Sequence, residues 1–438
     1  MSKKRKKKSN RSTTGDARSR NDRKLAKTPR KPVKGRARRK KSAPRLWIWV
    51  TVVVGLMLLC LLAAKVPGYI RMLRAPSQSA QAVLPEDGGQ GLSLAEIQEQ
   101  RLIVDVHEHI QGLEVASIYV EVMDELGIGT MCLMGSSLFT LTLNEEYGFT
   151  GYDENNEQLL DIVEAYPGRF TAWPTVNPED PDKLQKFKDY VSRGATGLKL
   201  YTGHGYVTDD NEYIFHPLAM DDPGMLPLYE YCEENHIPVC IHVNPFDNGT
   251  SRGKPGFCEE FVAILTRFPD MKVDCPHFML SSIKSSRLRE FLDTFPNLYT
   301  DISFGDYFMA AGLKRISRDP EKFRKLFADY PDRIMYATDL VLTKGRRKTK
   351  EWVYNQFKAY LDMLSKETYT TPAFPGEKLN GLALPGYLLE RVLYKNYREF
   401  MAKKPEGTDI IGEFDYDRAG VRRMYRKPGQ AFPPPTKR

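Results

Sequence analysis

Acidic residues are almost missing from the first 45 positions of this 438-residue chain. That segment holds 21 Lys and Arg residues against two acidic ones, a net charge of +19, so the remainder, with 44 basic and 54 acidic residues, carries −10. The net positive charge of the chain therefore comes from its amino-terminal tail. A folded domain that binds nucleic acid needs a basic face of its own, so we expect no specific nucleic-acid partner.

Charged residues are absent from positions 46–64, LWIWVTVVVGLMLLCLLAA. A helix of that length spans about 28 Å, close to the hydrocarbon thickness of a bilayer. A cleaved signal peptide is the alternative, but the basic region is too long for its n-region and the apolar run too long for its h-region. We predict an uncleaved, single-pass membrane protein that contacts the bilayer through 46–64. Because the basic residues precede the span, the amino terminus should be cytoplasmic and the main domain extracytoplasmic.

Cysteine is scarce, and none of the six residues forms a Cys-x-x-Cys pair. Cys60 lies in the apolar run, which leaves an odd five outside it. Neither a disulfide framework nor a cysteine metal site is therefore expected. Cys240 and Cys275 are predicted to be small buried thiols.

Short apolar, β-rich runs alternate with helical stretches from residue 99 onward. There are eight such runs: 101–106, 130–135, 170–176, 196–201, 238–243, 272–278, 298–303 and 333–339. This order predicts an α/β fold, a (β/α)8 TIM barrel over residues 99–400. A doubly wound sheet is less consistent, because no glycine-rich phosphate turn follows the first run. Residues 65–98 are expected to be a linker, and 401–438 a polar extension.

Polar residues recur where the predicted strands end, which is where barrel enzymes place their catalytic groups. The first run ends in Asp-Val-His-Glu-His, and a period of two turns both histidines to one side. The residues expected at the barrel mouth are His107, His109, Lys199, His242, His277 and Asp339. Imidazoles with a carboxylate suit Zn²⁺ or another divalent first-row ion. In the sixth run, the alternation that turns His277 inward directs Asp274 and Pro276 outward, where apolar residues are expected.

Lys199 has three open interpretations: a carbamylated bridge between two metals, a cation for a substrate carboxylate, or the partner of a buried acid. His204, in the long loop after the fourth run, is a candidate for substrate contact or an ordinary loop residue.

Several motifs follow one another in the order of a known family. They include VDVHEH, GIGTMCLMGSS, YPGRFTAWPTVNPEDP, GATGLKLY, NLYTDIS and DRIMYATDL. Over residues 101–400 the chain resembles the amidohydrolase-2 (amidohydrolase-related) type of the amidohydrolase superfamily, which includes aminocarboxymuconate-semialdehyde decarboxylase and its relatives. The resemblance implies that His107, His109, His242 and Asp339 hold one metal ion, with His277 as a further ligand or catalytic residue. Two ions bridged by carbamylated Lys199 are the alternative.

A zinc-type ion lowers the pKa of its bound water toward 7 and polarises a substrate oxygen. Asp339 is then the group that takes a proton from that water, and His277 is the group that stabilises the oxyanion or protonates the product. We therefore expect a membrane-anchored, metal-dependent hydrolase of a small amide, ester or lactone. The first alternative is a metal-dependent decarboxylase of a small carboxylic acid, and the second is an inactive tethered binding protein. Assembly into a homo-oligomer stays open.

Overall fold

The computed structural model describes residues 91–142, 149–201, 205–207, 213–215, 218–245, 257–279, 285–345, 347–402 and 414–415. The basic tail, the apolar run 46–64, most of the linker and His204 lie outside these ranges. Within them, no helix has both the length and the apolar character needed to cross a bilayer. The predicted membrane helix falls on residues that the structure does not describe, so it stays a prediction.

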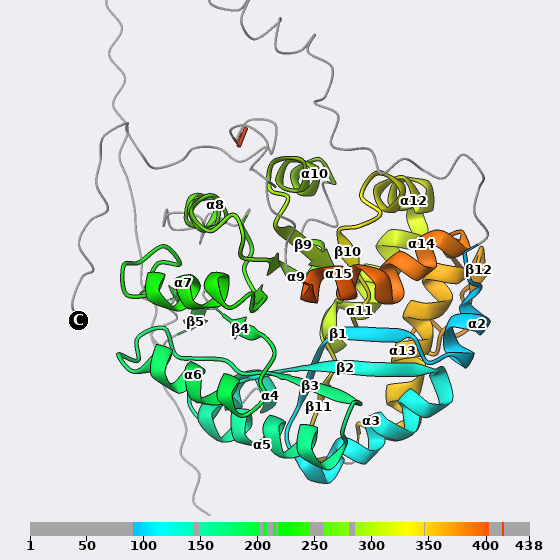
Figure 1. Ribbon diagram of the computed structural model, residues 1–438. Helices are drawn as coiled ribbons and strands as arrows, with labels where there is room; N and C mark the ends of the chain where they lie inside the picture. Colours follow the sequence, from blue (N-terminus) through cyan, green and yellow to red (C-terminus); the bar gives the residue numbers. More distant parts are fainter. Residues whose placement is uncertain are drawn as a thin grey trace, which may run out of the picture. The chain divides into compact units, whose positions relative to one another are not determined.

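Parallel strands form two sheets that together make a barrel (Figure 1). One sheet has the order β11-β1-β2-β3 and the other β10-β9-β8-β7-β4. Their bounds are β1 Ile103–Ile110, β2 Ile128–Met134, β3 Phe170–Trp173, β4 Leu198–Leu200, β7 Val239–Ile241, β8 Val273–Asp274, β9 Leu298–Asp301, β10 Ile334–Met335 and β11 Val341–Leu342.

Backbone contacts close the ring at both junctions between the sheets. A parallel bridge joins Thr175, just after β3, to Lys199 on β4. On the other side, Val106 N–H donates to the Tyr336 carbonyl at 3.1 Å, and β11 pairs in parallel with β1. β10 pairs with β9 and β11 with β1, so these two short segments together take the place of the eighth strand. The predicted α/β barrel is therefore confirmed as the architecture of the described residues.

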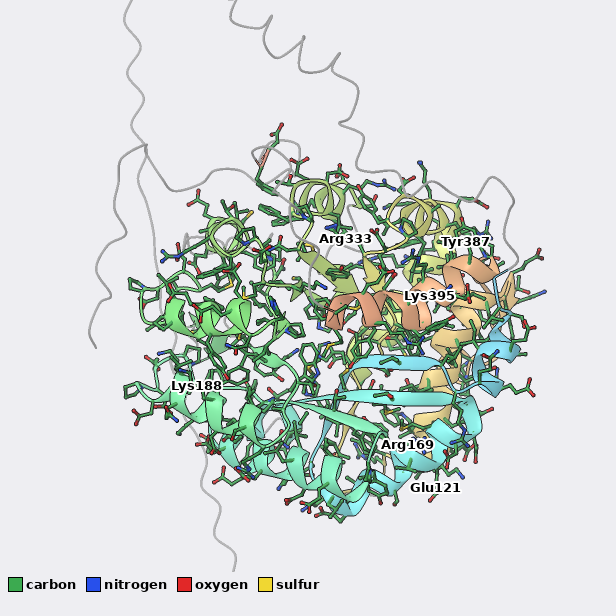
Figure 2. All side chains as sticks on the ribbon, viewed as in Figure 1. Glu121, Arg169, Lys188, Arg333, Tyr387 and Lys395 are labelled. Carbon is green, nitrogen blue, oxygen red and sulfur yellow. The ribbon has the colours of Figure 1, made fainter. Side chains whose placement is uncertain are left out.

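Helices cover the outside of the barrel. Each buries one stripe of apolar residues, as α3 does with Tyr119, Val122 and Leu126, while Glu121 lies at the outer rim (Figure 2). The helices that follow or flank the strands are α2 Leu94–Glu99, α3 Leu113–Leu126, α4 Leu138–Thr142, α5 Tyr152–Ala165, α6 Lys183–Ser192, α7 Leu226–Glu234, α8 Cys258–Arg267, α9 Pro276–Met279, α10 Ser285–Thr294, α11 Gly305–Arg318, α12 Pro320–Asp329, α13 Lys350–Ser365, α14 Gly386–Glu390, the π-helical turn η1 Arg391–Lys395 and α15 Asn396–Met401.

Two antiparallel hairpins and a docked residue complete the described fold. The hairpins are β5–β6, Gly205–Val207 with Tyr213–Phe215, and β12–β13, Thr368–Tyr369 with Leu379–Asn380. In the carboxyl-terminal extension, the Phe414 ring packs 4.5 Å from the ring of Phe291 on α10. The extension is thus attached to the barrel surface at this point.

The terminal helix is fixed to the start of the eighth strand by a buried amide. Asn396 donates from Nδ2 to the carbonyls of Pro331 and Ile334, both at 2.8 Å. Cys240 and Cys275 are buried, as predicted, and so are the other three cysteines of the described residues.

The side-chain alternation predicted for the sixth strand is wrong. β8 is only two residues long, and Asp274 is 1% exposed inside the barrel rather than turned outward. The chain then leaves the strand at Pro276, and residues 277–279 take left-handed backbone angles, with φ of 63°, 50° and 54°. His277 therefore reaches the interior through a left-handed turn and not through strand periodicity.

Candidate metal centre

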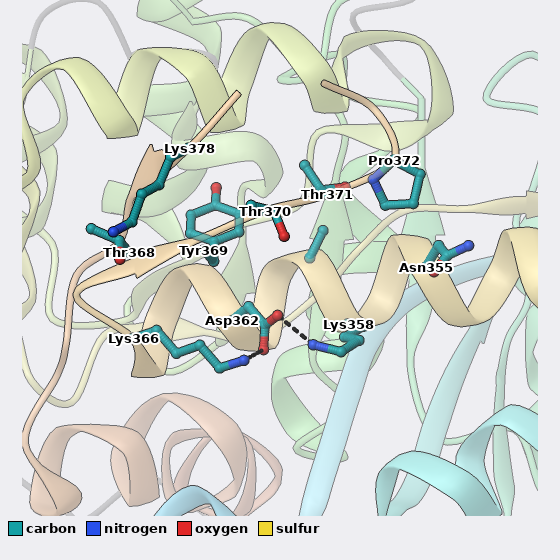
Figure 3. Close-up of a pocket in the computed structure, with 11 residues that line it drawn as sticks. Asn355, Lys358, Asp362, Lys366, Thr368, Tyr369, Thr370, Thr371, Pro372 and Lys378 are labelled. Atoms are coloured by element: carbon teal, nitrogen blue, oxygen red, sulfur yellow. Dashed lines mark hydrogen bonds and ion pairs between the residues drawn. The ribbon is translucent and has the colours of Figure 1, made fainter. Parts of the chain in front are cut away.

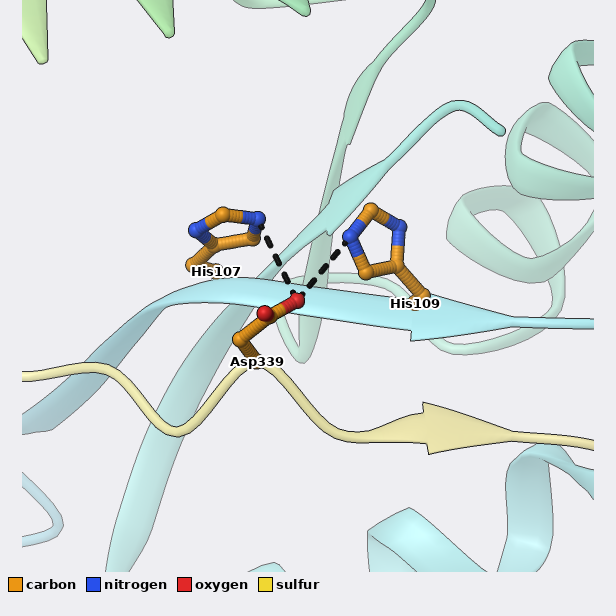
Figure 4. A group of neighbouring side chains, drawn as sticks. All are labelled: His107, His109 and Asp339. Carbon is orange, nitrogen blue, oxygen red and sulfur yellow. Dashed lines mark ion pairs between the residues drawn. The ribbon is translucent and has the colours of Figure 1, made fainter. Parts of the chain in front are cut away.

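Three side chains from the first and eighth strands converge at the carboxyl-terminal end of the barrel (Figure 4). His107 and His109 lie on β1, and Asp339 lies between β10 and β11 with its carboxylate directed at both rings. Asp339 Oδ1 is 3.5 Å from His107 Nε2 and 3.2 Å from His109 Nε2. One ligand atom from each residue fits within a group of atoms no more than 4.8 Å apart.

Hydrogen bonds on the far side of each imidazole hold the two rings in place. His107 Nδ1 is 2.9 Å from Asp301 Oδ2, and His109 Nδ1 is 3.0 Å from the Met134 carbonyl. The Asp301 carboxylate can only accept, so His107 carries its proton on Nδ1 and keeps a lone pair on Nε2. His109 Nδ1 lies between the Met134 carbonyl and the Ser136 hydroxyl, which is 2.7 Å away, and its Nε2 faces Asp339. Imidazoles that bind metals are typically oriented in this way. The donor set of two Nε2 atoms and one carboxylate therefore fits a divalent ion.

His277 and His242 lie beside this group. His277 Nε2 is 3.7 Å from Asp339 Oδ2 and 3.3 Å from His242 Nδ1. The Ser303 carbonyl, 3.1 Å from His277 Nδ1, fixes the proton there and turns Nε2 toward the centre. Among the described residues, His107, His109 and Asp339 form the compact ligand group, and His242 adjoins it through His277.

Lys199 lies within the site and is completely buried. Its Nζ is 2.8 Å from His107 Nε2, 3.4 Å from Cys240 Sγ and 5.1 Å from the centre of the Tyr201 ring. The ammonium thus donates to the lone pair that a metal ion would take. Binding of the ion would release this contact and leave the Lys199 cation beside the metal.

Asp301 is a functional residue that the sequence analysis missed. Its Oδ2 accepts from His107, and its Oδ1 accepts from the His277 N–H at 2.9 Å and from the N–H and hydroxyl of Ser303 at 3.0 and 2.5 Å. One carboxylate on β9 therefore positions His107 on β1 and His277 in the turn after β8. The sequence offers one indication of this role: Asp301 is an acidic residue at the end of its strand.

Gly305 is the second residue that the sequence analysis missed. It has φ of +66°, and a Cβ at this position would lie 2.9 Å from Asp339 Oδ2. Asp339 itself has φ of 57°, and its N–H donates to the His107 carbonyl at 2.8 Å. A non-glycine residue at 305 would displace the carboxylate, and strained backbone of this kind is common at functional sites.

A family model described as amidohydrolase matches residues 140–398, more than half of the chain. The chain belongs to the amidohydrolase family. The resemblance inferred from the motifs is thereby confirmed. His107 and His109 precede the matched segment, so their place in the centre depends on the geometry above.

Solved structures with similar folds include an uncharacterized TIM-barrel protein from Bordetella bronchiseptica (15% identity, 69% of this chain and 98% of that one, TM-score 0.45). Others are 5-carboxyvanillate decarboxylase from Sphingomonas paucimobilis (15%, 68% and 98%, 0.42) and a probable 2-pyrone-4,6-dicarboxylic acid hydrolase from Acinetobacter baumannii (13%, 68% and 99%, 0.41). No curated protein matches the chain.

The electrostatics of this amidohydrolase keep His107 neutral and Asp339 ionised. Burial lowers the pKa of His107 to about 4, and the Lys199 charge acts in the same direction. Burial alone would raise the pKa of Asp339, but His107, His109 and His277 together hold it below its usual range. A neutral imidazole and an ionised carboxylate are the forms that bind a cation. Asp105 and Glu108, on the same strand as the two histidines, are also buried, and burial raises the pKa of each carboxyl well above its usual range.

The metal-free protein is expected to lose stability relative to His107→Gln as the pH falls from 6.5 to 4. The unfolded histidine takes up a proton near 6.5 and the folded one only near 4, so acid favours the unfolded state by about 3 kcal/mol across this window. Urea unfolding of both proteins with a chelator present, at half-unit pH steps, measures the difference. A difference that stays constant from pH 6.5 to 4 would contradict the burial of a neutral His107.

Proposed function

We propose that this amidohydrolase is a metal-dependent enzyme that acts on a small carboxylic acid by non-oxidative decarboxylation. The observation that supports the proposal is the completely buried Lys199, 2.8 Å from the imidazole that also faces the metal position. A metal ion and a second cation side by side are complementary to an anionic substrate group. A neutral amide, ester or lactone has no group for the second cation, so hydrolysis, expected first from the sequence, becomes the second candidate.

A divalent ion at this site would polarise a substrate oxygen and stabilise negative charge on it. His107, His109 and Asp339 would hold the ion, and Lys199 would bind a substrate carboxylate. The bond between the carboxylate carbon and its neighbour breaks, CO₂ leaves, and the electron pair stays on the neighbouring carbon. His277, in its protonated form, donates the Nε2 proton to that carbon. The nitrogen and carboxylate donors suit Zn²⁺ as well as Mn²⁺, and zinc stays a prediction.

Hydrolysis remains the second candidate function because of the position of Asp339. Its Oδ1 is 3.5 Å or less from both ligand Nε2 atoms, so the carboxylate would lie beside any water that shares the metal. From there it would accept a proton from the water during attack on a carbonyl carbon. Both candidates therefore need the same three metal ligands and differ in the use of Lys199.

The two reactions are separated by a substrate screen with the Lys199→Met variant. We expect the metal-loaded wild type to release CO₂ from small aromatic or unsaturated carboxylic acids, and Lys199→Met to keep its metal while KM rises by about tenfold or more, since a buried charged contact to the substrate is lost. Turnover of neutral esters or lactones that is unchanged in Lys199→Met, without CO₂ release, would overturn decarboxylation in favour of hydrolysis.

We also propose that residues 46–64 anchor the chain in a membrane with the barrel outside the cytoplasm, on the basis of the +19 tail that precedes them. A reporter fused after residue 438 is expected to be active outside the cytoplasm, and protease added to intact cells should degrade the barrel. Protection of the barrel until the cells are lysed would contradict this orientation.

A further inference from the structure

A pocket of about 400 Å³ lies between α13 and the chain segment that follows it (Figure 3). Residues of one face of α13 form one wall, and residues 368–372 form the other. Tyr369, which is 4% exposed, contributes its ring to the lining. The volume is several times that of an inorganic oxyanion, so it has room for one with an organic substituent.

Basic side chains dominate this pocket. Lys358, Lys366 and Lys378 line it together with a single acid, Asp362, so the ionisable lining carries a net charge of +2. Asp362, with its side chain 8% exposed, pairs with Lys358 through one oxygen and with Lys366 through the other, the latter at 2.8 Å. Each ammonium has three donors and uses one on Asp362, so two donors remain on each for a ligand, and the shared carboxylate holds both ammonium groups beside the pocket.

A hydroxyl adds a neutral donor to the same lining. Thr371 is 6% exposed, and its Oγ1 accepts from the Ala373 N–H at 3.4 Å, which leaves the hydroxyl proton to donate. Hydroxyl and ammonium donors around a positively charged pocket are complementary to phosphate oxygens.

The pocket is remote from the metal centre. In a βα barrel each helix runs back from the carboxyl-terminal ends of the strands to their amino-terminal ends. Lys366 follows the last residue of α13, and the adjoining Asn380 N–H bonds to Ser317, near the end of α11, at 2.8 Å. Both helix ends lie at the face of the barrel opposite His107, His109 and Asp339.

We propose that this pocket binds a phosphate monoester. At neutral pH such a group carries a charge between −1.5 and −2, which matches the net charge of the pocket, and its substituent would occupy the remaining volume. Free phosphorylated molecules and the headgroup of phosphatidate present this same chemistry.

Ligand-induced thermal stabilisation of the full-length protein in detergent tests the proposal. Glycerol 3-phosphate and bicelles containing phosphatidate are compared with glycerol and with phosphatidylcholine bicelles. We expect a saturable rise in Tm of about 2 °C or more with at least one phosphate monoester, since a ligand that binds only the folded state stabilises it. The rise should be the same with and without a chelator, because the pocket is remote from the metal centre.

Lys378→Glu and Lys325→Glu form a matched pair of variants. Lys378→Glu puts a carboxylate at the pocket while both ion pairs of Asp362 stay in place, and Lys325→Glu makes the same charge change on the exposed face of α12. Any phosphate bound by the basic tail affects both variants equally. We expect the apparent affinity to fall at least about tenfold in Lys378→Glu and to stay unchanged in Lys325→Glu.

The outcomes are distinct. A shift with glycerol 3-phosphate that Lys378→Glu weakens supports a free phosphate ester, and a shift confined to phosphatidate bicelles with the same variant response supports a lipid headgroup. No shift with any phosphate monoester, or an equal shift in Lys378→Glu and the wild type, would overturn the proposal.

Discussion

His109→Ala is expected to abolish metal binding and catalytic activity together. His109 presents Nε2 to Asp339 at 3.2 Å while its Nδ1 is held by the Met134 carbonyl, so the substitution deletes a ligand whose orientation is already fixed. Loss of an outer partner alone typically weakens metal binding by 10–100-fold, so loss of the ligand should exceed about 100-fold. Elemental analysis after purification, together with an activity assay at saturating metal, measures both effects.

His236→Asn is the matched control for this experiment. His236 is exposed at the end of α7 and has φ of 55°, a backbone conformation that asparagine tolerates. This variant should keep the wild-type metal content and activity. Metal content in His109→Ala equal to that of the control would show that the ion is bound elsewhere.

Asp301→Asn is expected to weaken metal binding by about 10–100-fold without unfolding the barrel. At Oδ1, three donors from His277 and Ser303 require an oxygen, so the new amide must turn its NH₂ group toward His107. A donor at that position forces His107 to accept through Nδ1 and to carry its proton on Nε2. The lone pair that would bind the metal is then lost.

Competition with a chromophoric chelator measures the affinity of Asp301→Asn, and ¹⁵N chemical shifts of the imidazole report the tautomer of the metal-free protein. Asp362→Asn is a suitable control, because Asp362 is 8% exposed but lies on α13, remote from the centre. Unchanged affinity together with an unchanged His107 tautomer would contradict the positioning role of Asp301.

The sequence predicted that the polar residues of the site lie close together because parallel strands in a barrel end at one face. Polar residues at five separate strand ends had to converge, and the structure places His107, Lys199, His242, His277 and Asp339 around one point.

Asp301 and Gly305 could not be assigned in the same way. The role of Asp301 depends on its hydrogen bonds to His107 and His277, which are distant in sequence, so the sequence around Asp301 does not reveal it. The need for glycine at 305 arises from a contact with Asp339, which is distant in sequence. Asp274 was placed on the wrong side because strand periodicity fails where Pro276 and the left-handed residues 277–279 end the strand.

One divalent ion is expected to bind between His107, His109 and Asp339. Crystals of the metal-loaded protein, with diffraction measured on both sides of the absorption edge of the ion, locate it directly. We expect one anomalous peak at about 2.0–2.2 Å from both Nε2 atoms and from an Asp339 oxygen. Two peaks bridged by Lys199, or a peak that none of these three residues contacts, would contradict it.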